Sequence, residues 1–589
     1  MTLKSRRELD PITKRNVEAW LDPAFDEETR NLIEKMKAED VEGLTNAFYT
    51  RLKFGTGGLR GLMGIGTNRM NRYTVSFATQ GLANYLLKSF PRKECSVFIG
   101  YDSRNQSREF ADEAAAVLAG SGIKVYLSKE LCPTPFTSFC CRRHNCQAAI
   151  MVTASHNPAV YNGYKVYWSD GGQVLPPHDV GIVDEANKIN SPSQVKRADA
   201  NSGLIQHVYE EEKAAYLDAV TDLQISPEEN RKRGNELKII YSNLHGTGIQ
   251  LVPETLARWG FTNISYVESQ KAPDGNFPTV PFPNPEEKEA MRLGNEQLEK
   301  DNGDIFIATD PDADRMRAIV RHKGKNIWLN GNQIASIMLY HILKSLARRE
   351  KLPKKCAFVK TIVTTELFRR IAEGYDRPTY DVLTGFKYIA EKIHEWEQIE
   401  GGDQYLFGGE ESYGTLFGTH ARDKDAVIAT ALFAETALHA KLEGKTVVDL
   451  LHEIYRHYGI FGESLLSLTF PETKEGQEQI KKAVETLRSN PPTSLLDSEV
   501  INLKDYETSL EKDFKTGQQK PINLPKSAVL QLTLACNSKI TLRPSGTEPK
   551  IKLYAEVELK AQGPIDDTLA EAKARCTALL EALKALITQ

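Results

Sequence analysis

The chain has 589 residues, of which 26% are charged and 40% are hydrophobic, and its formal net charge is −4 at pH 7. This length is too great for one core and predicts three or four domains of an ordinary globular protein. The charge excludes an overall basic field for nucleic acid or membranes, although a few cations in a cleft would still permit local phosphate sites.

Cysteine usage and the N-terminal sequence indicate a reducing compartment. The eight cysteines form no CxxC pair and no regular framework, so free thiols are the better interpretation. No apolar signal segment follows the basic N-terminus, and no run of about 18 apolar residues occurs. We therefore expect a cytoplasmic protein.

The first 61 residues predict helices followed by a glycine-rich loop. Apolar side chains recur at helical spacing within residues 11–50. Residues 53–61 then read Lys-Phe-Gly-Thr-Gly-Gly-Leu-Arg-Gly, without the Lys-Ser/Thr ending of a nucleotide-binding loop and without a long preceding strand. We interpret this segment as a glycine-rich loop that presents Arg60.

From residue 97 onward, strand-like runs alternate with helical segments, as in a parallel sheet. The run 148–152 predicts a buried strand that ends in Thr-Ala-Ser-His-Asn-Pro at 153–158. Such a turn places Ser155 at the carboxyl edge of an open α/β sheet, where these folds hold their chemistry. Lys165 follows closely and could bring a cation to a phosphate. The absence of a GxSxG elbow argues against a hydrolase serine, and a purely structural Asn-Pro turn is the alternative.

A second loop is acidic. The strand-like run 304–308 leads into Asp-Pro-Asp-Ala-Asp-Arg at 310–315. Alternate residues of an extended loop can turn the same way, so Asp310, Asp312 and Asp314 can converge. Oxygen-only ligands suit Mg²⁺. Together with Ser155, this loop indicates metal-assisted phosphoryl transfer through a serine.

Two other interpretations of the acidic loop were open. A calcium EF-hand is excluded because Arg315 and Arg321 occupy the positions that require Gly and Glu. A solvated acidic turn is the simpler alternative. Two other stretches repeat this arrangement, with a strand at 237–241 before the loop 243–248 and a strand at 404–407 before the loop 408–414. We expect a helix after each of the three loops, which suggests related α/β domains in series.

Two later loops have the composition of ligand sites. Residues 409–414 read Gly-Glu-Glu-Ser-Tyr-Gly, which offers the donors and acceptors that sugar hydroxyls need, although an exposed turn fits equally well. Residues 543–550 read Arg-Pro-Ser-Gly-Thr-Glu-Pro-Lys, with two cations, two hydroxyls and a glycine that could cradle a phosphate. A plain basic turn is the alternative for the second loop.

The pattern changes again from about residue 466, where strands at 527–535 and 551–559 and an amphipathic helix at 567–587 predict an α+β domain. We place domain boundaries near 208, 323 and 465. The predicted domains are 1–208 with the serine loop, 209–323 with the acidic loop, 324–465 with the Gly-Glu-Glu-Ser-Tyr-Gly loop, and 466–589 with the basic loop.

Taken in order, these motifs resemble those of the α-D-phosphohexomutase family from Phe54 to about Tyr554. The resemblance implies an α/β fold of four domains around a central cleft, with three related α/β domains of mixed sheets and a C-terminal α+β lid. The acidic loop departs from the Asp-Gly-Asp-Gly-Asp-Arg of many members but keeps the carboxylates. The glycine-rich start and the Thr-Gly-Phe-Lys at 384–387 are similar to the long-form branch of phosphoglucomutases and phosphopentomutases.

The resemblance also implies residue roles. Ser155 would be the phosphoserine and would hold Mg²⁺ together with the three aspartates. Charge stabilisation or proton transfer falls to Arg60, Lys165 and Lys424, whereas His156 would position the serine. The substrate-binding residues implied are Arg60, Ser155, His156, Lys165, Asp314, Arg315, Gly385, Lys387, Glu410, Ser412, Lys424, Arg543, Ser545, Gly546 and Thr547.

The implied activity interconverts α-D-glucose 1-phosphate and glucose 6-phosphate, with glucose 1,6-bisphosphate as intermediate and activator. The partners would be small sugar phosphates, without nucleic acid or membrane, and the protein would be a monomer or dimer. Alternatives within the family act on ribose or mannose phosphates or make hexose bisphosphates. Two alternatives lie outside the family. One is an inactive sugar-phosphate-binding protein. The other is a haloacid-type phosphatase with Asp310 as nucleophile, in which the serine loop would have no role.

Overall fold

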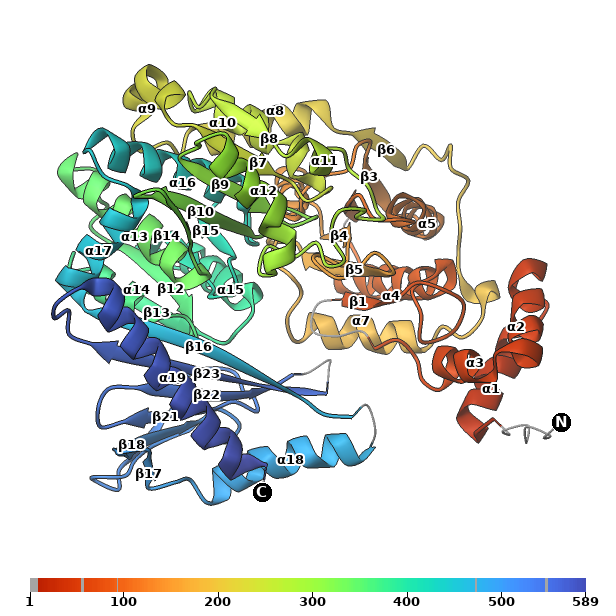
Figure 1. Ribbon diagram of the computed structural model, residues 1–589. Helices are drawn as coiled ribbons and strands as arrows, with labels where there is room; N and C mark the ends of the chain where they lie inside the picture. The colour runs from red at the N-terminus through yellow and green to blue at the C-terminus, as the bar shows by residue number, and fades with distance from the viewer. Residues whose placement is uncertain (1–8, 54–57, 93, 472–473, 546–548, 589) are drawn as a thin grey trace. The chain divides into compact units, whose positions relative to one another are not determined.

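The structure is a computed structural model that describes residues 9–53, 58–92, 94–471, 474–545 and 549–588 (Figure 1). The chain divides into two compact units. The first unit comprises residues 1–328, 390–398 and 414–438, and the second comprises residues 329–389, 399–413 and 439–589.

The first unit begins with the expected helices. They are α1 (Pro11–Trp20), α2 (Glu27–Glu39) and α3 (Val41–Phe48). Carboxylates cap the first two, because Asp10 accepts hydrogen bonds from the first turn of α1 and Asp26 from that of α2. Trp20, Phe25 and Phe48 are buried in a separate small core, which confirms the helices expected within residues 11–50.

The first sheet has six strands in the order β1-β5-β4-β2-β3-β6. Their bounds are β1 (Gly58–Leu62), β2 (Ser96–Tyr101), β3 (Lys124–Ser128), β4 (Ala148–Val152), β5 (Tyr161–Trp168) and β6 (Ile205–Val208). Strands β2, β3, β4 and β6 are parallel, whereas β5 is antiparallel to both β4 and β1. The sheet is therefore mixed, and the parallel strands carry their carboxyl ends to one edge.

Alternating side chains of β2 explain why helices cover both faces of this sheet. Val97 and Ile99 join a core with residues of α4 and α5, whereas Phe98 packs edge-on against Phe136 of α6 with ring centroids 6.2 Å apart. The helices are α4 (Arg72–Ser89), α5 (Ser107–Gly120), α6 (Thr134–Arg143) and α7 (His178–Asn187). These helices agree with the alternation of strands and helical segments expected from residue 97 onward.

The second sheet has five strands in the order β11-β10-β9-β7-β8. The strands are β7 (Ile239–Ser242), β8 (Ile264–Tyr266), β9 (Ile305–Thr309), β10 (Met316–His322) and β11 (Lys325–Trp328). The helix expected after the acidic loop is wrong, because β10 follows it and pairs antiparallel with β9, with Met316 opposite Thr309. The acidic loop is thus the turn of a hairpin.

The helices that accompany this sheet in sequence are α8 (Glu210–Thr221), α9 (Pro227–Arg233), α10 (Val252–Arg258), α11 (Glu268–Lys271) and α12 (Lys288–Lys300). Three further elements contribute residues to the first unit: α15 (Phe386–Glu397), β15 (Thr415–Phe417) and α16 (Ala426–Leu442). Leu298 of α12 is buried with Phe306 and Ala308 of β9, so the strand that leads into the acidic loop is fixed by its core.

The second unit contains a parallel sheet in which β12 pairs with both β13 and β14. These strands are β12 (Cys356–Thr361), β13 (Thr379–Val382) and β14 (Gln404–Gly409), and their helices are α13 (Gly331–Arg348), α14 (Glu366–Glu373) and α17 (Val447–Tyr458). Caps begin two of these helices, since Asn330 and Gln333 form a capping box for α13, and Thr446 and Asp449 form one for α17.

The C-terminal part of this unit is an antiparallel sheet with the order β16-β23-β22-β21-β18-β19-β20, and β17 pairs with β18. Its elements are β16 (Ile460–Thr469), α18 (Lys474–Ser489), β17 (Ser494–Leu495), β18 (Ser498–Asp505), β19 (Leu510–Asp513), β20 (Gln519–Pro521), β21 (Leu530–Leu534), β22 (Lys539–Pro544), β23 (Lys550–Leu559) and α19 (Ile565–Ile587). Helix α19 lies across this sheet, as Figure 1 shows. The expected α+β segment is confirmed.

Two of the predicted boundaries fall within strand pairs of the structure. Residue 323 lies in the turn between β10 and β11, which pair with each other, and residue 465 lies inside β16, which pairs along its whole length with β23. Boundaries near 329 and 459 would leave both strand pairs intact and therefore agree better with the structure. The division into four domains is unchanged as a prediction. In the part of the chain that the structure describes, no helix is long and apolar enough to cross a membrane.

Candidate active site

Ser155 follows the end of β4 by three residues and is buried. Its φ angle is 53°, in the left-handed region that non-glycine residues rarely adopt. The Ser155 N–H donates to Thr153 Oγ1 over 2.8 Å, which fixes the turn. A strained serine held in this way is a feature of functional sites, where the surrounding structure maintains the strain.

A buried ion pair supports the serine loop from the neighbouring strand. Asp102 follows the end of β2 and accepts hydrogen bonds from Thr153 Oγ1 at 2.6 Å and from the Arg104 N–H at 3.0 Å. The Arg104 guanidinium donates to the carbonyl oxygens of Pro158 at 2.8 Å and Ser155 at 2.5 Å. Sequence reasoning missed this pair. The available signal was a Gly-Tyr-Asp-Ser-Arg turn after a strand parallel to β4.

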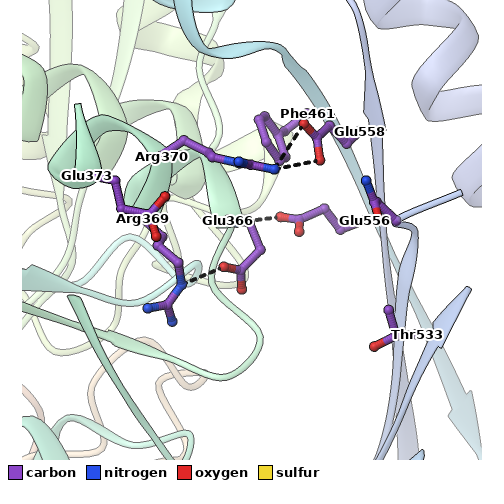
Figure 2. Close-up of a pocket in the computed structure, with 9 residues that line it drawn as sticks. Glu366, Arg369, Arg370, Glu373, Phe461, Thr533, Glu556 and Glu558 are labelled. Carbon is purple, nitrogen blue, oxygen red and sulfur yellow. Dashed lines mark hydrogen bonds and ion pairs between the residues drawn. The ribbon is translucent and has the colours of Figure 1, made fainter. Parts of the chain in front are cut away.

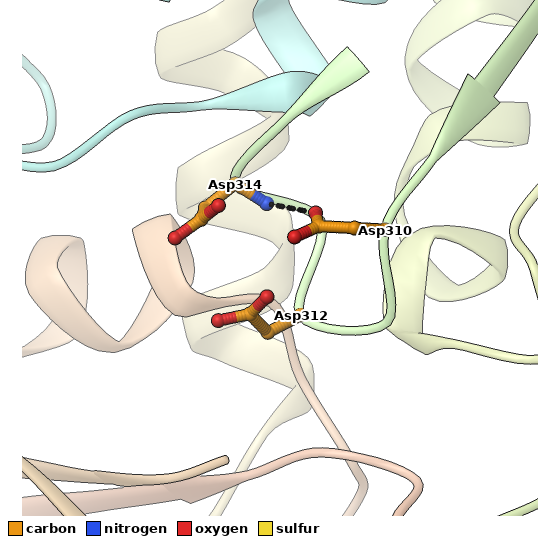
Figure 3. Close-up of side chains that lie close together, drawn as sticks. All are labelled: Asp310, Asp312 and Asp314. Carbon is orange, nitrogen blue, oxygen red and sulfur yellow. Dashed lines mark hydrogen bonds between the residues drawn. The ribbon is translucent and has the colours of Figure 1, made fainter. Parts of the chain in front are cut away.

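The acidic loop brings its three carboxylates together as predicted. Asp310, Asp312 and Asp314 are buried, and one oxygen of each lies within 4.8 Å of the others (Figure 3). Ala313, with φ 48°, makes the turn, and the N–H groups of Asp314 and Arg315 donate to Asp310 Oδ1 at 3.1 and 3.0 Å. The loop backbone therefore orients the first carboxylate.

Two lysines balance this negative charge. Lys165 Nζ donates to Asp312 Oδ2 at 2.8 Å and to Asp314 Oδ2 at 3.3 Å, and Lys424 Nζ lies 3.0 Å from Asp314 Oδ2. Burial, then repulsion from Asp312, raises the pKa of Asp310 well above its usual value. Burial would also raise the pKa of Asp312, but the charge and hydrogen bond of Lys165, together with Thr134 and the charge of Lys424, lower that pKa.

The donor set fits a hard divalent cation. Asp312 Oδ1 and Asp314 Oδ1 are buried, and neither accepts a hydrogen bond from the residues that the structure describes. Leaving buried carboxylate oxygens without a hydrogen bond is costly, and a cation would satisfy both. The three aspartates therefore have the ligand chemistry and convergence that Mg²⁺ requires.

The serine and the acidic loop meet. Ser155 Oγ donates to Asp310 Oδ2 over 3.1 Å and lies 3.2 Å from Nδ1 of His156. Burial, then the positive charges of Arg315 and Arg60, lowers the pKa of His156 well below its usual value. His156 is therefore neutral at pH 7, which agrees with a positioning role better than with a cationic one.

The two predicted arginines of this unit lie close by. Arg60 lies on the edge strand β1, opposite Gly163 of β5, and not in a loop as expected. Its guanidinium donates to Asn157 Oδ1 of the serine loop over 3.2 Å. Arg315 lies 2.8 Å from Glu286 Oε1 and 3.7 Å from Asp314 Oδ1. Residues 54–57 of the glycine-rich segment lie outside the described residues.

In the second unit, the structure brings together two of the predicted sugar-binding residues. The Gly385 N–H donates to Glu410 Oε1 over 2.9 Å. Glu410 directly follows β14 and Gly385 comes shortly after β13, so both lie beyond the carboxyl ends of parallel strands. Ser412 is partly exposed in the same loop as Glu410, and Lys387 is buried in the first turn of α15. Burial, then the charge of Glu410, raises the pKa of Glu411 to about 7.

The predicted phosphate loop lies between β22 and β23. Arg543 is on β22 opposite Lys552, and the Ser545 N–H donates to the Lys550 carbonyl over 2.8 Å. Strands β22 and β23 are therefore paired neighbours, and each carries cations near the predicted phosphate loop. Gly546 and Thr547 lie outside the described residues.

The second unit also contains a cavity of about 270 Å³, which none of the predicted site residues lines. Figure 2 shows that its two arginines pair with Glu366 and Glu558, and that the Glu556 carboxylate reaches the backbone of Glu366. Arg369 Nε lies 2.9 Å from Glu366, Arg370 lies 3.4 Å from Glu558, and the Glu366 N–H donates to Glu556 over 2.8 Å. We interpret these contacts as a structural link between α14 and β23. The lining residues are Glu366, Arg369, Arg370, Glu373, Phe461, Thr533, Asn537, Glu556 and Glu558.

A strained serine beside three converging carboxylates and two lysines is the arrangement expected of an enzyme of phosphoryl transfer through a serine. Comparison with known proteins narrows this class. The α/β/α domains I, II and III of phosphoglucomutase/phosphomannomutase match residues 51–193, 214–324 and 330–458. The chain belongs to this family, which confirms the predicted α-D-phosphohexomutase membership and the fold of three α/β domains followed by a sheet-rich C-terminal domain.

Individual relatives agree. The chain is 37% identical over 518 residues to a phosphoglucomutase of Staphylococcus haemolyticus, covering 87% of this chain and 91% of that protein. It is 36% identical over 548 residues to a phosphoglucomutase of Staphylococcus aureus strain USA300, covering 92% and 95%. The open form of parafusin from Paramecium, an exocytosis-sensitive phosphoprotein also named phosphoglucomutase, has the same fold, with a TM-score of 0.67, 18% identity and coverage of 91% and 95%.

Proposed function

We propose that the chain is a phosphoglucomutase that interconverts α-D-glucose 1-phosphate and glucose 6-phosphate. The observation that carries the proposal is the 3.1 Å hydrogen bond from Ser155 Oγ to Asp310, within a buried carboxylate trio that two lysines contact. The name of the relatives supports the choice of sugar.

In the proposed reaction, Ser155 carries a phosphoryl group. A free hydroxyl of the bound sugar phosphate attacks the phosphorus, the bond to Ser155 Oγ breaks, and glucose 1,6-bisphosphate forms. The bisphosphate then turns, and its other phosphoryl group returns to Ser155. Most of the catalysis is positioning and charge neutralisation.

The residues of the first unit have matching tasks. Arg104 and Asp102 hold the serine loop in its strained shape, and His156 orients the hydroxyl. Lys165 and Lys424 supply positive charge at the carboxylates, and Arg60 and Arg315 offer guanidinium groups to phosphate oxygens. Mg²⁺, held by Asp310, Asp312, Asp314 and a phosphoserine oxygen, would neutralise charge on the transferring group.

The residues of the second unit would recognise the part of the substrate that does not react. Glu410 and Ser412 would bind sugar hydroxyls, with Gly385 and Lys387 beside them. The phosphate that is not reacting would be held by Arg543, Ser545, Gly546 and Thr547. The sugar binds in two orientations, and each orientation places a different phosphate at Ser155. The residues of the second unit must therefore accept the sugar in either orientation.

The setting of the enzyme follows from the same proposal. Its partners would be small sugar phosphates, with glucose 1,6-bisphosphate as activator, and we keep the expectation of a monomer or dimer. All eight cysteines are free, which supports a cytoplasmic location.

Initial rates on three substrates test the function. Glucose 1-phosphate, mannose 1-phosphate and ribose 1-phosphate would each be supplied with Mg²⁺ and the corresponding bisphosphate. Glucose 1-phosphate should give the highest kcat/KM, because a site built to bind a hydroxyl penalises a ligand that leaves it unpaired. A higher kcat/KM on ribose or mannose 1-phosphate would move the assignment to that sugar. No turnover on any of them would indicate a binding protein.

A further inference from the structure

The carboxylate of Asp423 accepts hydrogen bonds from both the backbone N–H and the side-chain ammonium of Lys424. Its backbone N–H donates to Asp423 Oδ1 at 2.8 Å, and its Nζ donates to the same oxygen at 3.0 Å. The ammonium also lies 3.0 Å from Asp314 Oδ2. Asp423 is buried, so this carboxylate fixes the direction in which the lysine side chain leaves the backbone.

The other oxygen of Asp423 is fixed from the first sheet. Tyr167 Oη donates to Asp423 Oδ2 over 2.8 Å, and the Tyr167 side chain is fully buried on β5. Burial, then the charge of Asp423, raises the pKa of this phenol well above its usual value, so it keeps the proton that it donates. The carboxylate therefore cannot rotate without losing a buried hydrogen bond.

Strand β5 thereby orients both active-site ammonium groups. Lys165 and Tyr167 are two residues apart, so their side chains leave the same face of the strand. Lys165 reaches Asp312 and Asp314 directly, whereas Tyr167 acts on Lys424 through Asp423. One rigid element thus sets the relative position of two lysines that lie far apart in sequence.

The loop around Lys424 holds the lysine side chain in this position. A Cβ on Gly414 would lie 2.1 Å from Lys424 Cδ, so only glycine leaves room for the lysine stem. The backbone just after Lys424 is fixed at two points, because the Asp425 N–H donates to the Thr415 carbonyl at 2.8 Å and the Ala426 N–H donates to the Ala313 carbonyl at 3.1 Å. The second of these hydrogen bonds joins the Lys424 loop to the acidic loop itself.

We propose that Tyr167 and Asp423 are positioning residues that preorganise the Lys424 ammonium beside Asp314 for the charge of the transferring phosphoryl group. This inference rests on the proposed function. A free lysine side chain has several rotatable bonds, and fixing it before the reaction removes that entropic cost from the transition state. Tyr167 and Asp423 affect the rate only through where Lys424 lies.

Kinetics of Tyr167→Phe in the full-length protein test the proposal. The variant should lower kcat about tenfold, as expected for one buried hydrogen bond, and change KM less than about twofold. Tyr164→Phe is the matched control, since Tyr164 is fully buried on the same strand and its hydroxyl lies 3.0 Å from Thr79 Oγ1. That control should keep the wild-type kcat.

A double-mutant cycle separates positioning from general loosening. Tyr167→Phe should cost little further activity in a Lys424→Met background, measured by single-turnover phosphoryl transfer, because the residue that it positions is gone. Should Tyr167→Phe fail to fold by circular dichroism, Asp423→Asn takes its place in the same cycle.

Provided that wild-type turnover is normal, any of three results would overturn the proposal. Tyr167→Phe could leave kcat unchanged, or Tyr164→Phe could lower kcat as much as Tyr167→Phe does. Tyr167→Phe could also cause the same fold-loss in rate in the Lys424→Met background as in the wild type. Absence of wild-type turnover would instead refute the proposed function.

Discussion

The hydroxyl of Ser155 donates to Oδ2 of Asp310 over 3.1 Å, although the two residues are 155 positions apart in the chain. Each follows a buried strand, β4 for the serine and β9 for the aspartate, and these strands belong to different sheets of the same unit. A serine hydroxyl and a carboxylate of the acidic loop therefore meet where two sheets present their loops, which is the arrangement that the proposed phosphoserine and metal site require. The proposed phosphoryl transfer requires both the Ser155 hydroxyl and the Asp310 carboxylate.

Ser155→Ala should abolish mutase turnover, because removing a covalent carrier costs many orders of magnitude in kcat. Initial rates with glucose 1-phosphate and mass spectrometry of the serine-loop peptide measure the loss of activity and of phosphate. Ser193→Ala, an exposed serine of the same unit, should behave as wild type. Residual activity of Ser155→Ala above about 10% of wild type would exclude an obligatory phosphoserine at this position.

Chelation of divalent cations should stop turnover, and added Mg²⁺ should restore it. Asp312→Asn removes one charge from the trio and takes the charge out of the 2.8 Å contact with Lys165, so metal affinity and rate should fall together. Calorimetric titration with Mg²⁺ gives the affinity directly. Asp112→Asn, on the exposed face of α5, is the control. Full activity after chelation would identify the acidic loop as a structural turn.

Arg543→Ala should raise KM by about one to two decades, because lost charge-assisted hydrogen bonds of this kind are worth roughly 1.5–3 kcal/mol. The phosphate content of Ser155 and Mg²⁺ binding should survive, since both depend on residues of the first unit. Lys520→Ala, on the exposed strand β20, is the control. An unchanged KM in Arg543→Ala would mean that the β22–β23 loop is not the distal phosphate site.

The sequence predicted the two central loops because each follows a short, continuous apolar run. The run 148–152 is β4, and the run 304–308 is β9 shifted by one residue. These signals are local. The helix expected after the acidic loop failed because β10 is buried along most of its length, and a short buried run does not reveal whether it is strand or helix.

The features of the site that could not be predicted from the sequence depend on non-local contacts. Arg60 lies on a short strand with two glycines, which has little intrinsic strand preference and forms by pairing with β5. The support of the serine loop by Asp102 and Arg104, and of Lys424 by Tyr167, joins segments that only the folded sheet brings together. Residue type alone does not distinguish these buried charges from exposed ones.

A pH-dependent cost in stability is built into the second unit. Glu463 of β16 lies directly opposite Glu556 of β23 in the strand register, and Glu463 Oε2 is buried without a hydrogen bond from the described residues. Burial, then repulsion from Glu556, raises the pKa of Glu463 to about 8, against partial compensation from Thr365, Asn330 and Lys573. In the unfolded chain this carboxyl titrates near 4.5.

Between these two pKa values the folded state binds a proton that the unfolded state has released, so the contribution of Glu463 to stability falls as pH rises from about 4.5 to about 8. Glu463→Gln is always neutral and should remove this loss. Its melting temperature should match that of the wild type near pH 4.5 and exceed it increasingly up to pH 8. At pH 8 the free energy of unfolding of the variant should be higher than that of the wild type by on the order of 2 kcal/mol or more. Differential scanning calorimetry at several pH values measures the trend, with Glu499→Gln on the exposed face of β18 as the control. A difference that stays constant with pH would show that Glu463 is ionised in the folded protein throughout this range.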